Sequence, residues 1–266
     1  MHALFVFAHQ DDEIAAAARI AYLLREGATI SCVYLTDGEG RRASSRDRDD
    51  ESRRALARLG VNLDRVHFIG SDFHIPDGAL VEHLERALSL LEQRIADPVN
   101  EVWCLAWEGG HQDHDASHLV ALAFAADRDL LDRCFEVPLY HGHGMRGAFF
   151  QTLAPLPAGK PWTGRRVPVG EAMKLLALCR FYRTQRKTWL GLLPGAIARL
   201  VIGQREWTRR VDVARLAGPP HEGVLFYERR FGYRPETFER HARDFIERAC
   251  VPRRTDPGRP RPDGSR

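Results

Sequence analysis

The first half of the chain alternates short apolar runs with longer segments in which apolar residues recur at helical spacing. The short runs have the length and the side chains of buried strands. The longer segments are typical of amphipathic helices, and glycines that suit helix C-termini stand where two of them end, at Gly27 and Gly60. The pattern predicts strands over residues 3–8, 29–35, 66–69, 101–106 and 135–139, and helices over residues 12–26, 46–59, 80–95 and 114–131.

This alternation predicts an α/β fold with three layers, in which helices cover both faces of a largely parallel sheet. The regular pattern stops near residue 145, and a Gly- and Pro-rich stretch over 154–168 precedes a predicted helix over 169–186 and short strands such as 223–227. The predicted parts are a core over residues 1–145, a less regular C-terminal part of the same domain over 146–250, and a disordered tail over 251–266.

The composition is that of an ordinary soluble protein, with 266 residues of which 44% are hydrophobic and 28% charged. The formal net charge is only +3, and the body of the chain has no block of Lys and Arg interleaved with aromatic residues. We therefore expect no nucleic-acid partner. The five cysteines lack paired spacing, which indicates reduced thiols and a cytoplasmic protein.

Membrane insertion is not expected either. The first apolar run breaks at His9, which is too early for a signal peptide. The longest later apolar stretch, residues 189–202, contains Pro194 and Arg199 and is too short to span a bilayer. Core packing is the favoured interpretation of this stretch, and an apolar face toward a partner or a membrane surface is the alternative.

Two clusters of ionisable residues follow predicted strands. The first, His9-Gln10-Asp11-Asp12-Glu13, comes directly after the strand over 3–8. The second, His111-Gln112-Asp113-His114, follows the strand over 101–106, with His118 one helical turn further on. Open α/β sheets bind ligands at the C-terminal ends of their strands, so we expect the two clusters to form one site.

The residue types fit a hydrolytic metal centre. His9, Asp12 and His114 would bind one Zn²⁺ per chain through imidazole nitrogens and a carboxylate, leaving a position open for water. The same ligands tolerate Fe²⁺ or Co²⁺. Asp11, beside the ion without being needed as a ligand, would take the proton from the metal-bound water.

The second cluster would supply further catalytic groups. His111 would donate a proton to a leaving group or stabilise developing negative charge, and Asp113 would fix its tautomer. Each cluster alone has a structural explanation, because acidic residues at a helix start often serve only as caps. Their occurrence together, at matching strand ends, favours the metal site.

The paired motifs resemble the signature of the LmbE-like, or PIG-L, family of zinc-dependent N-acetylglucosaminyl deacetylases, which usually reads H-P-D-D-E and H-x-D-H-x-x-x-H. The resemblance covers residues 3–140 well and residues 170–187 weakly. Further segments that resemble the family are Leu35–Glu39, Arg48–Glu51 with Ala55, Leu59 and Gly60, Pro76–Leu80, and Lys174, Ala177, Tyr182 and Gln185.

The resemblance implies a Rossmann-like fold and a hydrolase that removes the N-acetyl group from an N-acetylglucosaminyl conjugate, a small-molecule substrate. By position, His9, Asp12 and His114 match the zinc ligands of the family. Asp11 matches its general base, and His111 matches the histidine that stabilises the oxyanion or protonates the amine.

Candidate substrate contacts are less specific. Arg48 and Asp77 match residues that hold sugar hydroxyls in some members of the family. His141 and His143 belong to a glycine-flanked segment and could line the substrate pocket. One branch of the family has a tyrosine where this chain has Gly109, so we expect no oxyanion contact from that position.

Two other functions remain open. The first is an amidase that acts on a non-acetyl amide of a sugar conjugate. The second is a non-catalytic Rossmann-like binding module that uses the turn Asp37-Gly38-Glu39-Gly40, although this turn lacks G-x-G-x-x-G spacing. The sequence identifies neither the aglycone nor the oligomeric state, and it leaves a homo-oligomer open.

Overall fold

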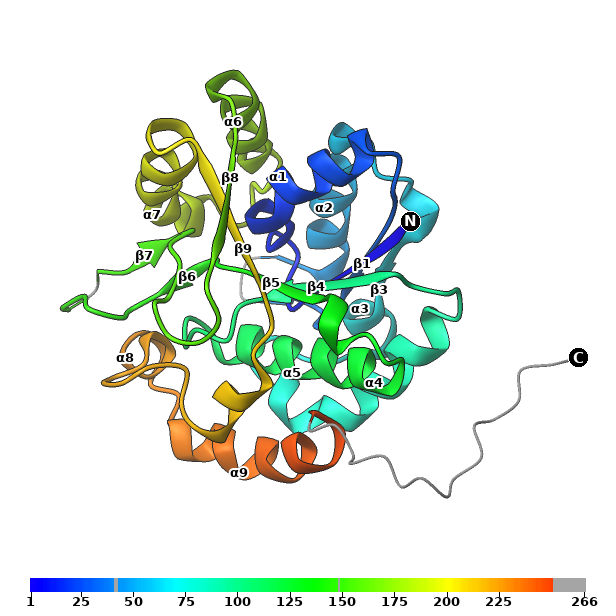
Figure 1. Ribbon diagram of the computed structural model, residues 1–266, viewed down its shortest axis with the longest axis vertical. Helices are drawn as coiled ribbons and strands as arrows, with labels where there is room; N and C mark the ends of the chain where they lie inside the picture. Colours follow the sequence, from blue (N-terminus) through cyan, green and yellow to red (C-terminus); the bar gives the residue numbers. More distant parts are fainter. Residues whose placement is uncertain (41–42, 148, 251–266) are drawn as a thin grey trace, which may run out of the picture.

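The computed structural model describes residues 1–40, 43–147 and 149–250 and confirms the three-layer α/β architecture (Figure 1). Within these ranges, seven strands form the central sheet in the order β3-β2-β1-β4-β5-β9-β8. The first five are parallel, and β9 runs antiparallel to both β5 and β8. The strands are β1 (His2–Phe7), β2 (Thr29–Tyr34), β3 (Val66–Phe68), β4 (Glu101–Leu105), β5 (Cys134–Val137), β8 (Thr163–Arg166) and β9 (Arg205–Arg210). The predicted tail over 251–266 lies outside the described residues.

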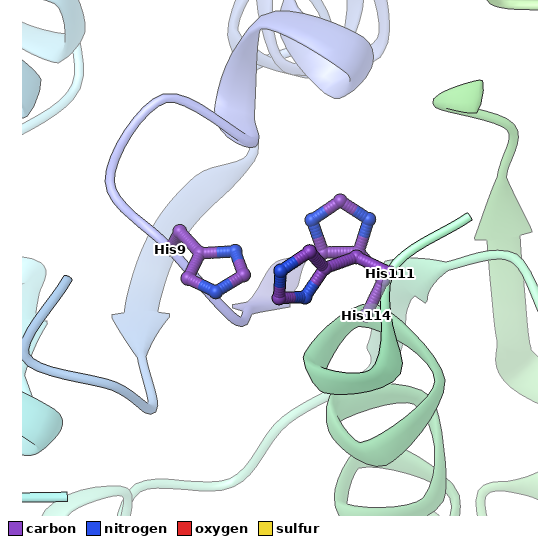
Figure 2. A group of neighbouring side chains, drawn as sticks. All are labelled: His9, His111 and His114. Carbon is purple, nitrogen blue, oxygen red and sulfur yellow. The ribbon is translucent and has the colours of Figure 1, made fainter. Parts of the chain in front are cut away.

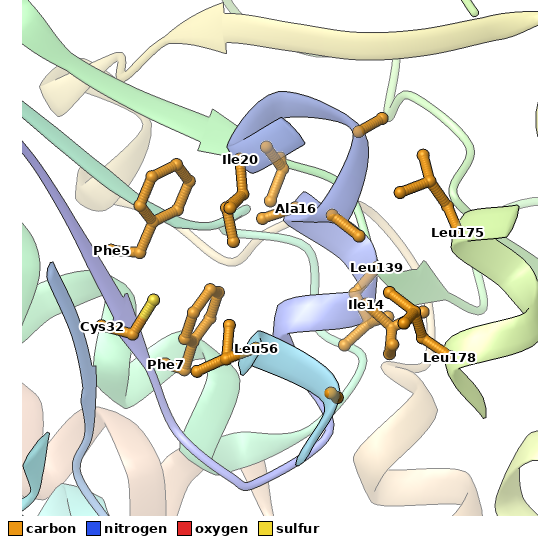
Figure 3. Close-up of a cluster of buried hydrophobic side chains, with 14 of the residues drawn as sticks. Phe5, Phe7, Ile14, Ala16, Ile20, Cys32, Leu56, Leu139, Leu175 and Leu178 are labelled. Atoms are coloured by element: carbon orange, nitrogen blue, oxygen red, sulfur yellow. The ribbon is translucent and has the colours of Figure 1, made fainter. Parts of the chain in front are cut away.

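Successive residues of a strand point to opposite sides of the sheet. Because both sides carry apolar side chains, helices cover both faces. Phe5 and Phe7 of β1 pack into one apolar core, drawn in Figure 3, whereas Leu4 and Val6 pack into the other. The first core is completed by α1 (Glu13–Arg25), α2 (Ser45–Leu59), α6 (Val169–Leu176) and α7 (Arg186–Ala196), and the second by α4 (Leu84–Arg94), α5 (Gln112–Asp127) and α9 (Pro235–Phe245).

The strand order determines where the two polar clusters lie. β1 and β4 are neighbours, with β2 on the far side of β1 and β5 on the far side of β4. At such a switch point the connections leave in opposite directions and open a crevice at the C-terminal ends of the strands. His9 follows β1 and His111 follows β4, so both clusters lie at this crevice.

The C-terminal part departs most from the sequence prediction. The predicted strand over 223–227 is wrong, because Phe226 begins a helix, α8 (Phe226–Phe231). The predicted helix over 169–186 is interrupted, since α6 passes into a 3-10 segment, η4 (Ala177–Phe181). The last two strands of the sheet, β9 and the edge strand β8, were not predicted, because their many arginines hide the alternation that marks a half-buried strand. A short ribbon of β6 (Tyr140–His141) and β7 (Gln151–Thr152) lies outside the main sheet.

The long apolar stretch over 189–202 is helical. It forms most of α7, which contains Pro194, and a following π-helical segment, η5 (Ile197–Ile202). Trp189, Leu192 and Leu200 are buried in the first core, so core packing explains one side of this stretch. None of the helices in the described ranges combines the length and apolar character that a bilayer crossing requires.

Candidate active site

Three imidazoles meet at the switch point. His9 comes from the loop after β1, and His111 and His114 come from the start of α5 (Figure 2). Each ring offers one nitrogen atom, and these three nitrogens all lie within 4.8 Å of one another. The ring centroids of His9 and His111 are 4.8 Å apart, and each of these rings is 5.2 Å from that of His114. The two predicted clusters therefore form one site.

Asp12 connects the two motifs. Its Oδ1 is 3.1 Å from His114 Nε2, and its Oδ2 is 3.7 Å from His9 Nδ1. Oδ2 also accepts the backbone N–H groups of Ala8 and His9, at 3.1 and 2.8 Å, which ties the carboxylate to its own loop. Burial alone would raise the pKa of Asp12, but the charge and hydrogen bond of His114 lower it to about 2. Asp12 is thus an anion in contact with two imidazoles.

His9 is surrounded by carboxylates. Its Nε2 lies 3.1 Å from Asp77 Oδ1 and 3.1 Å from Asp113 Oδ2. Burial lowers the pKa of His9, but Asp77, Asp113 and Asp12 together outweigh it and raise this pKa well above its ordinary value. A buried group of imidazoles with this excess of negative charge suits a cation.

Asp113 contacts His111 through its backbone and not, as predicted, through its carboxylate. Its carboxylate accepts from His9 and from the backbone N–H groups of Gly78 and Leu80, instead of supporting His111. His111 is contacted by the backbone N–H of Asp113, which donates to Nδ1 at 3.2 Å. Because burial and the neighbouring charge of His9 lower the pKa of His111 to about 3, its ring is neutral. A neutral ring that accepts at Nδ1 carries its proton on Nε2, so His111 is a hydrogen-bond donor at that atom.

Asp11 is held by contacts from three directions. Its φ of 115° is rare for a residue other than glycine, and its backbone N–H donates to Glu13 Oε2 at 2.9 Å. Arg48 Nη2 donates to Oδ1 at 3.2 Å, and the indole of Trp189 donates to Oδ2 at 3.1 Å. Burial outweighs the charge of Arg48 and raises the pKa of Asp11 to about 7. This carboxyl group can therefore exchange a proton near neutral pH.

Arg48 links the site to the turn after β2. It donates to the carbonyl oxygens of Gln10 and Gly38, and its Nη1 lies 3.7 Å from Asp77 Oδ2. Gln10 stands where the family usually has proline, and its Nε2 donates to Asp49 Oδ1 at 2.7 Å. The hydrogen bond of the Gln10 side chain thus restrains the loop where the family has a rigid proline ring.

The turn after β2 has structural contacts of its own. Asp37 Oδ1 accepts the backbone N–H groups of Glu39 and Asp77, at 2.9 and 3.0 Å. This use of the carboxylate gives no support to the predicted alternative of a nucleotide-binding turn.

A cavity of about 180 Å³ opens over these groups. Arg48 and Asp77 line it, as predicted for substrate contacts, together with the imidazoles, Asp11 and Asp12. The remaining walls come from segments whose role was not predicted: Leu139, Tyr140, Gln185, Thr188, Trp189, Leu192 and Phe231.

His141 and His143 are not among the residues that line this cavity, so their predicted place in it is wrong. His141 is buried, and its Nε2 lies 3.1 Å from the carbonyl oxygen of Ala154. The ring of His143 packs instead against His221, at 5.2 Å between centroids. Tyr140, the residue before His141, has its ring toward the site. The centroids of the Tyr140 and His114 rings are 5.2 Å apart.

The segment over residues 170–187, which resembles the family weakly, packs against the first motif. Tyr182 donates a hydrogen bond to Glu13 Oε1, and the other oxygen of Glu13 holds the backbone of Asp11. Gln185 lines the cavity. The region over 170–187 therefore supports the first motif from the side of α7.

Glu108 supports the loop that carries the second motif. Its Oε1 accepts the backbone N–H groups of Leu139 and Tyr140, both at 2.8 Å. Its Oε2 is buried and has no hydrogen-bond partner among the described residues. Burial raises the pKa of Glu108 to about 8, so the folded protein keeps this carboxyl group protonated at neutral pH.

This protonation predicts a pH-dependent stability. From about pH 4.5 to about 8 the unfolded chain has lost the proton that the folded chain still binds, so the free energy of unfolding falls as pH rises. In the Glu108→Gln variant, which has no such proton, we expect a smaller fall. Urea unfolding at both ends of this range measures the difference, with the exposed Glu222→Gln as control. Equal pH dependence in Glu108→Gln and the unmodified protein would contradict the assignment.

Comparison with known proteins agrees with this geometry. Residues 4–125 match the family described as PIG-L: GlcNAc-PI de-N-acetylase. This part of the chain is a PIG-L, or LmbE-like, deacetylase domain. The match includes both motifs and confirms the predicted family and the predicted N-deacetylase class. No curated protein matches the chain significantly.

Solved structures share the fold of this PIG-L domain and extend the similarity beyond it. A deacetylase from the teicoplanin biosynthesis pathway has a TM-score of 0.59 at 15% identity, covering 80% of this chain and 99% of its own. The A40926 pseudoaglycone deacetylase has a TM-score of 0.57 at 19% identity, covering 79% and 98%. The N,N'-diacetylchitobiose deacetylase from Pyrococcus horikoshii has a TM-score of 0.52 at 19% identity, covering 78% and 82%. At these identities the similarity establishes the common fold.

Proposed function

We propose that this protein hydrolyses the N-acetyl group of an N-acetylglucosaminyl conjugate in a metal-dependent reaction and releases acetate. The family match supports a deacetylase of N-acetylated sugars. The observation that carries the detailed proposal is the position of Asp11, a carboxyl group with a pKa near 7 that lines the same cavity as three clustered imidazoles.

His9, Asp12 and His114 would hold the metal ion. Their nitrogen and oxygen atoms are suitable donors, and the buried His114 Nδ1 has no hydrogen-bond partner among the described residues. When bound, the ion would polarise the amide carbonyl and lower the pKa of water. Asp77 and Asp113, which contact His9, would orient that ligand.

Asp11 would act as the general base. Arg48 and Trp189 fix its two oxygens and keep the carboxylate directed at the cavity. A proton taken from the attacking water can later be returned to the leaving nitrogen by the same group. His111 would donate from Nε2 to the oxyanion of the tetrahedral intermediate.

Tyr140 and the aromatic walls would position the substrate. Burial raises the pKa of Tyr140 well above its ordinary value, so its hydroxyl stays neutral and able to donate, and the residue lines the cavity. Trp189 and Phe231 offer apolar surface for a sugar ring, and Arg48 and Asp77 offer a donor and an acceptor for its hydroxyls.

The ion itself is part of the proposal. Imidazole and carboxylate donors favour Zn²⁺ but accept Fe²⁺ or Co²⁺. A solved relative is described as the zinc inhibited form of teicoplanin deacetylase Orf2, so zinc is tested at more than one concentration. The cytoplasmic location, the division into parts within one domain and a homo-oligomer remain predictions.

Acetate release tests the function. We expect the metal-loaded protein to release acetate from at least one member of a panel of N-acetylglucosaminyl compounds, and a chelator to abolish the release. Adding back Zn²⁺, Fe²⁺ or Co²⁺ separately identifies the ions that restore turnover. Release of a different acyl group, with N-acetyl compounds untouched, would favour the alternative amidase. A protein that binds no divalent ion would contradict the proposal.

A further inference from the structure

The helical segment α7–η5 is apolar on its outer side as well as on its inner side. Trp189, Leu192 and Leu200 of the inner side are buried. On the outer side, Leu190 is 70% exposed and Ile202 is 75% exposed. A helix that is apolar all round is normally buried all round, yet the chain covers only one side of this one in the described residues.

Neighbouring residues extend this surface. α6 packs against η5 and adds Val169 and Met173, both exposed. We name Val169, Met173, Leu190, Ile197 and Ile202 the outer patch. Figure 1 places α6 and α7 together at one end of the molecule, away from α9. An exposed apolar surface of this kind, on neighbouring elements, marks an interaction site.

The segment that carries the outer patch is positively charged. Residues 169–203 contain six Lys or Arg residues and a single acidic residue, Glu171, which pairs with Arg25. This segment carries +5, against +3 for the whole chain. Within the described ranges none of the six cations forms an ion pair, and all are exposed: Lys174, Arg180, Arg183, Arg186, Lys187 and Arg199.

We propose that α6, α7 and η5 dock this protein on an anionic lipid surface. Exposed aliphatic side chains flanked by Lys and Arg are the signature of helices that lie in a membrane interface. The aliphatic residues enter the acyl boundary, and the cations meet the lipid headgroups. A second copy is a poorer occupant, because a two-fold contact would set this positively charged surface against itself.

The helix that carries much of the outer patch also lines the active-site cavity. The inner side of α7 contributes Thr188, Trp189 and Leu192 to the cavity that holds Asp11. A lipid surface against the outer patch therefore lies one helix away from the reacting groups.

Vesicle sedimentation tests the docking. We expect the protein to sediment with vesicles of phosphatidylcholine mixed with phosphatidylglycerol, to bind pure phosphatidylcholine vesicles far more weakly, and to be released by salt. Replacing three cations, in Arg186→Gln/Lys187→Gln/Arg199→Gln, should weaken the partitioning about a hundredfold. Leu190→Ser/Ile202→Ser should also weaken it, since it removes the apolar part.

Matched controls lie on other surfaces of the molecule. Arg133→Gln/Arg240→Gln/Arg243→Gln removes the same amount of exposed charge, and Leu63→Ser removes an exposed aliphatic side chain. Both controls should bind vesicles like the unmodified protein. The proposal is overturned if the unmodified protein ignores anionic vesicles, or if the controls weaken binding as much as the patch variants. Self-association through the patch, without vesicle binding, would also overturn it.

Activity on a soluble substrate separates this proposal from the proposed function. Acetate release from soluble N,N'-diacetylchitobiose should be the same in the patch variants and the unmodified protein. Release from an N-acetylglucosaminyl lipid embedded in anionic vesicles should fall in the patch variants. Activity on the soluble compound with no vesicle binding would overturn the docking alone. Vesicle binding without acetate release from any compound would overturn the proposed function and leave the docking supported.

Discussion

Replacing Asp11 by asparagine is expected to lower acetate release about a hundredfold to ten thousandfold while the metal content stays that of the unmodified protein. Asparagine has nearly the same shape but cannot take a proton from water. It keeps one oxygen, so one of the two donors, Arg48 or Trp189, retains its acceptor. The loop should therefore keep its conformation, including the unusual φ of 115° at this position. Steady-state acetate release and elemental analysis of the purified variant measure the two effects.

A buried neighbour supplies the control for this experiment. Asp49 accepts hydrogen bonds from Gln10 and Ser71 but does not line the cavity. Asp49→Asn should keep most of the activity, because its carboxylate contacts neither the imidazoles nor the reacting groups. An Asp11→Asn variant that remains active would show that another group takes the proton. Loss of metal from Asp11→Asn would instead make Asp11 part of the ion's coordination.

The proximity of the two motifs could be predicted because it depends on local patterns and one topological rule. The apolar run of β1 and the run of β4 each end in polar residues, and neighbouring parallel strands bring their C-terminal ends to one edge. His9 and His114 are far apart in the sequence, yet each is placed by the strand before it. Once β1 and β4 are known to be neighbours, the sequence pattern is enough to place both histidines in one site.

The walls of the cavity could not be predicted in the same way. Trp189 lies in an apolar stretch whose pattern favours plain core packing, and only the fold shows that its indole reaches Asp11. Phe231 lies on α8, close to the segment that was predicted as a strand. Tyr140 and His141 are adjacent, but a β-ribbon turns successive side chains to opposite sides, so the tyrosine faces the site and the histidine does not.

The role of Asp113 shows a second limit of sequence spacing. In the H-x-D-H motif, Asp113 stands two residues after His111, which suggested a direct pair. The first turn of α5 instead points its carboxylate at the backbone of Gly78 and Leu80. That segment is distant in the sequence, and its approach depends on tertiary packing. The carboxylate consequently supports His9 across the site.

Asp12→Asn and His111→Asn form a matched pair that tests the ligand set. Asp12→Asn should lose most of its metal, with an affinity loss larger than the tenfold to about hundredfold typical of residues that only orient a ligand. Asparagine can still accept the backbone N–H groups of Ala8 and His9, so the loop should remain folded. His111→Asn should keep its metal and lose activity. Asparagine is a good N-cap, so it can replace the ring that accepts the N–H of Asp113 at the start of α5.

Metal content after dialysis against limiting zinc separates two arrangements that the geometry allows. The clustered nitrogens of His9, His111 and His114 could themselves hold an ion, as an alternative to the set that includes Asp12. If His111→Asn lost the metal and Asp12→Asn kept it, the ion would have three neutral ligands. Asp12 would then serve to orient His114, and the oxyanion would have to rely on Tyr140 instead of His111. Metal retention by His111→Asn is therefore what the proposed role of His111 as a donor requires.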